Sequence, residues 1–162
     1  MKISRTTTAA AAALIVATVV AGAALAGTAK TIPFSGKYAG TAVTNVTDNV
    51  VAISANGTGT GSLIGAGKIT GKGTGDSSVQ PCVPFTGTGS MTGAKGTLAF
   101  KVIPGSSGCG DEDGQVFSIT ARATVLKATG ALAKAKGSLK FTGVYNRGAG
   151  TFSVKVTGTL TR

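Results

Sequence analysis

Three of the five acidic side chains in the sequence are consecutive. They form the segment Asp111-Glu112-Asp113, which lies directly after Cys109-Gly110. Carboxylates bind Ca²⁺, but calcium loops place their ligands at alternate positions and add a distal bidentate glutamate. Neighbouring side chains in this segment point in different directions. The pattern therefore predicts a solvated loop tip, and no metal site is expected.

Histidine is absent from all 162 residues, and so is tryptophan. This composition excludes a Ser-His-Asp triad, a Cys-His pair and histidine-ligated zinc. Gly71-Lys72-Gly73 resembles part of a phosphate-binding loop, but glycine follows the lysine where serine or threonine is needed. The motifs predict no cofactor and leave the catalytic residues unknown.

The first 26 residues have the pattern of a secretory signal peptide. Lys2 and Arg5 precede an uncharged stretch over 9–26, which ends in the small-x-small site Ala24-Leu25-Ala26. The alternative is a membrane anchor, but 18 mostly alanine residues are borderline for spanning ~30 Å of hydrocarbon. We expect Sec-type export from a bacterium and an extracellular protein. After cleavage we expect no transmembrane segment and one domain over 27–162.

Cys82 and Cys109 are the only cysteines of the chain. Export would place them in an oxidising compartment, where paired cysteines form disulfides. A bridge between residues 27 positions apart lowers the entropy of the unfolded chain, which stabilises the folded state by ~3–4 kcal/mol. A redox pair or two free thiols are the alternative, although the CxxC spacing and a neighbouring histidine are missing. The sequence predicts a structural disulfide.

After the leader, apolar residues alternate with polar ones, which is typical of half-buried strands. The clearest alternating runs begin at Phe34, Val51, Leu98, Phe117, Leu139 and Phe152, and weaker ones lie near 63–70 and 83–88. We expect the second run to end at the turn dipeptide Asn56-Gly57. About eight strands separated by glycine-rich turns predict an all-β fold, either an antiparallel β-barrel or a β-sandwich.

Glycines share strand faces with aromatic residues. Gly36 and Gly40 lie on the face of Tyr38, and Gly143 lies on the face of Tyr145. Glycine inside a strand is destabilising unless a bend or a close backbone contact requires it. Alternating large and absent side chains suit a tightly curved sheet, so this pattern favours the barrel over the sandwich.

Basic residues are concentrated late in the chain. Residues 27–113 hold six basic and five acidic side chains, whereas 114–162 hold eight basic and no acidic ones. Lys101, Lys140 and Lys155 each lie between two apolar residues and should point outward. The charge indicates either solubility or an anionic partner such as a cell-wall polymer. No motif or aromatic pattern indicates specific nucleic-acid binding.

A short pattern beginning with Thr-Gly occurs three times. The copies cover 60–66, 88–96 and 129–137, at spacings too irregular for a solenoid. We interpret the pattern as a reused connection in which an apolar residue enters the core and fixes the register of two antiparallel strands.

The second and third copies continue into GTLAF and GSLKFTGVY. This pattern resembles the barrel shared by allene oxide cyclases and dirigent proteins, over 87–103 and 129–160. The third copy departs from it at Ala128 and Lys134. The resemblance implies a small, often trimeric barrel whose lumen holds an apolar ligand, and it carries over no catalytic residue.

These observations favour a secreted, non-catalytic β-barrel that binds an apolar ligand or an anionic cell-envelope surface. One alternative, which rests on the resemblance, is an isomerase or cyclase acting in the lumen with Tyr38, Tyr145 and Arg122 as its polar groups. The other is a structural protein of the envelope.

Overall fold

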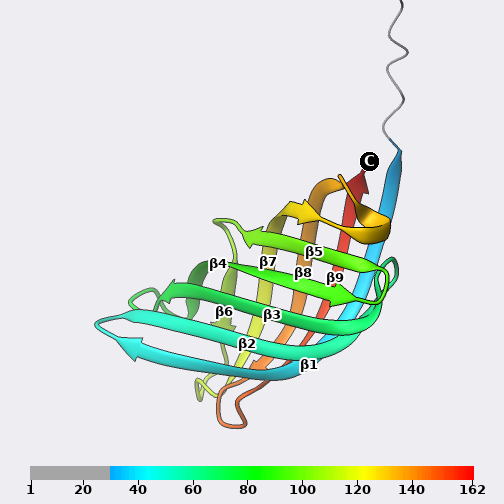
Figure 1. Cartoon of the computed structure of the whole chain (residues 1–162). Helices are drawn as coiled ribbons and strands as arrows, with labels where there is room; N and C mark the ends of the chain where they lie inside the picture. Colours follow the sequence, from blue (N-terminus) through cyan, green and yellow to red (C-terminus); the bar gives the residue numbers. More distant parts are fainter. Residues whose placement is uncertain (1–29) are drawn as a thin grey trace, which may run out of the picture.

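The computed structural model describes residues 30–162, and the expected leader lies outside them. Nine antiparallel strands make up most of this part of the chain (Figure 1). Their bounds are β1 Thr31–Thr47, β2 Val50–Gly61, β3 Gly65–Asp76, β4 Cys82–Gly93, β5 Gly96–Val102, β6 Ser107–Gly110, β7 Val116–Ala128, β8 Lys136–Asn146 and β9 Thr151–Thr161. A single 3-10 turn, η1 at Gly130–Leu132, precedes β8.

The strands close into an antiparallel β-barrel with eight strand positions around its wall. The expected β-barrel is therefore confirmed, and the alternative β-sandwich is wrong. Each strand pairs with the next along the chain, except that β5 does not pair with β6, and β9 pairs with β1 to close the barrel. The short strands β5 and β6 occupy one position between them, because both pair with β4 on one side and β7 on the other. The result is an up-and-down barrel with one interrupted strand.

The interruption between β5 and β6 was not expected from the sequence. The buried hydroxyl of Ser106 bridges it, donating to the Ile103 carbonyl at 2.8 Å and accepting from the Arg122 amide at 3.0 Å. Cys82 of β4 lies directly opposite Cys109 of β6, and the two form the expected disulfide. The bond joins the shorter part of the interrupted strand to its neighbour.

Alternation along the strands separates an inner face from an outer one, as expected. Phe34, Tyr38 and Ala42 of β1 are buried. Between them, partly buried residues on the inner face alternate with exposed residues on the outer face. The expected turn at Asn56-Gly57 is wrong, because β2 continues unbroken to Gly61. Gly57 instead lies opposite Gly40 of β1, and a Cβ on either glycine would overlap the other backbone. The local turn signal marks a close approach of two strands.

All three copies of the Thr-Gly pattern reach the same end of the barrel. Each brings a fully buried apolar residue to the core, namely Ile64, Met91 and Leu132. The three connections also contact one another: the Lys95 amide donates to the Ile64 carbonyl, and the Ala131 amide donates to the Lys95 carbonyl. In the second copy the Thr-Gly dipeptide lies within β4 rather than at its end.

The two ends of the described chain lie beside these connections (Figure 1). The Lys30 amide donates to the Arg162 carbonyl at 3.0 Å, and the Arg162 amide donates to the Lys30 carbonyl at 3.2 Å. The guanidinium of Arg162 also donates to the Ala131 carbonyl. Residues 30–162 contain no helix with the length and hydropathy that crossing a bilayer requires.

Candidate functional site in the barrel lumen

The interior divides into two halves along the barrel axis. The half beside the three connections, here called the filled half, is packed with large side chains that are almost fully buried. Its largest members are Phe34, Tyr38, Ile64, Met91, Leu98, Leu139, Val156 and Leu160. The opposite half, here called the open half, contains a cavity of about 270 Å³.

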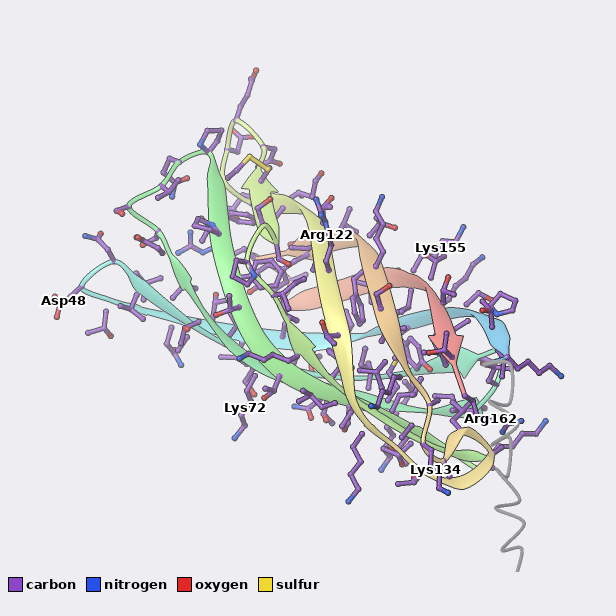
Figure 2. All side chains as sticks on the ribbon, turned by 90° about the horizontal axis from the view of Figure 1, so that it is seen from above. Asp48, Lys72, Arg122, Lys134, Lys155 and Arg162 are labelled. Carbon is purple, nitrogen blue, oxygen red and sulfur yellow. A yellow bond between two sulfur atoms is a disulfide. The ribbon has the colours of Figure 1, made fainter. Side chains whose placement is uncertain are left out.

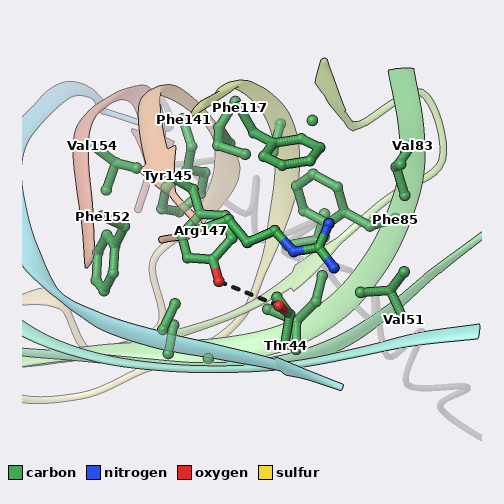
Figure 3. Close-up of a pocket in the computed structure, with 18 of the residues that line it drawn as sticks. Thr44, Val51, Val83, Phe85, Phe117, Phe141, Tyr145, Arg147, Phe152 and Val154 are labelled. Carbon is green, nitrogen blue, oxygen red and sulfur yellow. Dashed lines mark hydrogen bonds between the residues drawn. The ribbon is translucent and has the colours of Figure 1, made fainter. Parts of the chain in front are cut away.

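One wall of the cavity is aromatic, and the other has no aromatic residue and consists mainly of aliphatic and small residues (Figure 3). The aromatic wall, which comes from β4, β5, β7, β8 and β9, consists of Phe85, Phe100, Phe117, Phe141, Tyr145 and Phe152. Two ring pairs stiffen it, with centroids 5.0 Å apart for Phe100–Phe141 and 6.2 Å apart for Phe117–Tyr145. The facing wall from β1 to β3 combines aliphatic residues with small ones, namely Val46, Val51, Ile53, Ile69, Ala42, Ala55 and Gly71. The space remains because no ring from this wall reaches across the lumen to the aromatic wall.

Few polar groups line this apolar space. The Tyr145 hydroxyl lies 3.3 Å from the Thr44 hydroxyl, and the two form a hydrogen bond across the cavity (Figure 3). The exposed side chain of Arg147, in the β8–β9 turn, also lines the cavity. A site of this kind can hold an apolar molecule and orient one polar group on it.

The opening of the cavity follows from the sheet topology. β1 pairs with β9 only as far as Thr41, and its remaining residues pair with β2 alone. The β1–β2 hairpin therefore separates from β8 and β9, and its tip lies apart from the β8–β9 turn (Figure 1). The hydrogen bond between Thr44 and Tyr145 spans the place where the strands diverge.

All five acidic residues lie at this open end, four of them in connections and one at the end of a strand. Asp48 is in the β1–β2 turn, Asp76 ends β3, and Asp111-Glu112-Asp113 follow β6. The Asp111 carboxylate accepts hydrogen bonds from the Gln115 and Val116 amides at 2.8 and 3.1 Å, so it shapes a turn. Within residues 30–162, no three His, Cys, Asp or Glu side chains gather as metal ligands would.

Hydrogen bonds from Ser78 lower the pKa of the exposed Asp76 carboxyl below its ordinary value. Because the five acidic residues all lie there, the rim of the open end is acidic. Arg147 is the cation that the structure places at the cavity itself.

The three polar residues proposed for lumen chemistry do not meet. Tyr145 lines the cavity, but Tyr38 is buried in the filled half, and its hydroxyl has no hydrogen-bond partner. Arg122 points outward from β7, because its inward neighbours Ala121 and Ala123 take the core face. The lumen position that the isomerase alternative requires for Arg122 is therefore wrong, and Arg122 belongs to the outer wall. Sequence reasoning missed Arg147, whose only signal was its place in the turn Asn146-Arg147-Gly148.

The comparisons with known proteins returned no similar family model, no similar curated protein and no similar solved structure. The cavity and its lining are thus the observations from which a function can be argued.

Proposed function

We propose that this protein is a secreted, non-catalytic β-barrel that binds a small apolar molecule in the open half of its lumen. The observation that carries the proposal is the apolar cavity of about 270 Å³, which opens at one end of the barrel. An engineered apolar cavity of roughly 150 Å³ already binds benzene. The present cavity is large enough for a bigger ring system or a branched chain.

The polar groups at the site support binding rather than catalysis. The Tyr145 hydroxyl is held by Thr44, and the chain has no histidine that could act as a base near it. A general base must lie within hydrogen-bond reach of the proton that it removes. The leader pattern and the Cys82–Cys109 disulfide support export. The proposal also agrees with the resemblance to the allene oxide cyclase and dirigent barrels.

A filling substitution tests the proposal. Val51 lines the cavity, whereas Val43 is 61% exposed on the outer face of the adjacent strand. We expect Val51→Trp to weaken binding of the neutral dye N-phenyl-1-naphthylamine at least roughly tenfold, because the indole occupies the dye's volume. Val43→Trp should leave the affinity unchanged. Equal affinities for both variants, in a titration of dye fluorescence, would exclude the lumen as the binding site.

A further inference from the structure

Five cations form a continuous line on the outer wall, and lumen binding does not require any of them. The line, here called the basic stripe, has one exposed member on each of five adjacent strands, β5, β7, β8, β9 and β1. In that order its members are Lys101, Arg122, Lys140, Lys155 and Lys37. Arg122 and Lys155 are seen projecting from the outer surface in Figure 2.

The strand register makes these residues neighbours. Arg122 lies directly opposite Lys140, and Lys155 lies directly opposite Lys37. Lys101 pairs with Thr124, two residues from Arg122, and Lys140 pairs with Thr157, two residues from Lys155. Direct and diagonal neighbours therefore alternate along the stripe. With strands about 4.8 Å apart, the stripe extends for roughly 20 Å around the barrel.

This arrangement is unfavourable for the barrel alone. Like charges directly opposite each other destabilise an antiparallel pair, and the stripe contains two such pairs. The acids that could neutralise them are all at the open end, and none belongs to β1, β5, β7, β8 or β9. An external anion would relieve the repulsion that the fold leaves in place.

Hydroxyl groups surround the stripe. Thr120 and Thr124 flank Arg122 on the outer face of β7, and Ser138 and Thr142 flank Lys140 on β8. Hydroxyl donors beside lysine and arginine are the usual contacts to phosphate oxygens along a polymer. Along the outer faces of β7 and β8, charged donors thus alternate with neutral hydroxyl donors.

We propose that the basic stripe binds a flexible linear polyanion whose phosphate or carboxylate groups repeat along the chain. The stripe crosses five strands, so it follows the curved circumference of the barrel. A flexible chain can follow this curve and reach all five cations. A planar membrane touches a convex wall along a narrow line, which makes a membrane the less suitable partner.

Removal of one opposed pair tests the stripe. We expect Lys37→Gln with Lys155→Gln to weaken binding of long-chain inorganic polyphosphate roughly tenfold in moderate salt, and to flatten the salt dependence by about two counterions. The matched control is Lys68→Gln with Lys95→Gln, which removes the same charge from outside the stripe. The control should bind almost as the unmodified protein does.

Poly-L-glutamate provides the carboxylate arm of the experiment. The proposal is supported if either polymer binds the unmodified protein and binds the Lys37→Gln, Lys155→Gln variant roughly tenfold more weakly. Vesicles of phosphatidylglycerol and phosphatidylcholine provide the planar arm. Equal weakening by the two double variants would overturn the stripe, and so would vesicle binding as tight as polymer binding.

Thermal unfolding checks folding, since the stripe variant loses a repulsive pair and should be at least as stable as the control. Dye binding in the lumen should stay unchanged, so failure of the stripe is distinguishable from failure of the lumen proposal.

Discussion

The filled and open halves of the barrel are built on the same strands, yet side chains fill only one of them. In the filled half, Phe34 and Tyr38 of β1 belong to one buried cluster with Leu139 of β8 and Leu160 of β9, and connections cover the end. In the open half, β1 supplies Ala42, Thr44 and Val46, which are smaller than Phe34 and Tyr38 and leave the lumen unfilled. The alternation along the strand is the same in both places. What differs is the size of the inward residues and the contact between connections.

This difference teaches that the two ends have separate sources of stability. The filled half is held by buried apolar surface and by hydrogen bonds among the connections. The open half contains the cavity, the separated β1–β2 hairpin and the short strand β6. The Cys82–Cys109 disulfide also lies in this half. The comparison predicts that substitutions of the same type will have different effects at the two ends.

The largest effect is expected from loss of the disulfide. Cys82→Ala with Cys109→Ala should lower the free energy of unfolding by about 3.5 kcal/mol, since the bond closes a loop of 27 positions. Urea unfolding followed by far-ultraviolet circular dichroism measures this change. Reduction of the unmodified protein with dithiothreitol is the control and should produce a similar shift. A loss below about 1 kcal/mol would mean that the open half does not depend on the bond.

The second prediction compares one substitution in the two halves. Ile64→Ala in the filled half removes a fully buried side chain and should lower the free energy of unfolding by about 3 kcal/mol. Ile119→Ala in the open half should lower it by about 1 kcal/mol, because its side chain already borders the cavity. Equal losses in urea unfolding would contradict the division of the interior into a filled and an open half.

The smallest effect is expected at Tyr38, and it is a gain. Its buried hydroxyl has no hydrogen-bond partner, so Tyr38→Phe removes an unsatisfied polar group while it retains the ring. We expect the free energy of unfolding to rise by about 1 kcal/mol at neutral pH. Tyr145→Phe is the matched control, since it breaks the hydrogen bond to Thr44 and should give no such gain.

The same residue predicts a pH dependence. Burial raises the pKa of the Tyr38 phenol above its ordinary value of 10.0, so the folded state holds the proton more tightly than the unfolded state. This contribution to stability is complete below pH 10 and is lost as the pH rises through the folded-state pKa. The unmodified protein should therefore lose more stability than the Phe variant between pH 9 and pH 11. Parallel curves for the two proteins would show that Tyr38 has no part in the loss.

Much of the fold could be predicted from the sequence, because alternation assigns each strand residue to a face. The inward positions of Tyr38 and Phe141, the outward positions of the strand lysines, and the disulfide were all predicted correctly. The strand β6 was missed because Ser107-Gly108-Cys109-Gly110 has no apolar side chain to alternate. It becomes a strand because β4 and β7 both provide partners.

The site itself was less predictable, because it depends on pairings between distant segments. Arg147 was expected in a turn, but its place at the cavity depends on where β1 leaves β9. The basic stripe has the same origin. Alternation shows that Lys140 and Lys155 point outward, but only the register shows which cations are neighbours.

The pairing of β1 with β9 has a consequence for the kinetics of folding. Thr31 of β1 lies opposite Thr161 of β9, whereas every other pair of neighbours in the barrel comes from segments close along the chain. Hairpins form within microseconds, but closure of a loop over most of the chain must first overcome a larger entropy loss. The sheet should therefore assemble hairpin by hairpin and close last between β1 and β9. Until that step the chain is a curled, open sheet, and it has no lumen in which a ligand could be held.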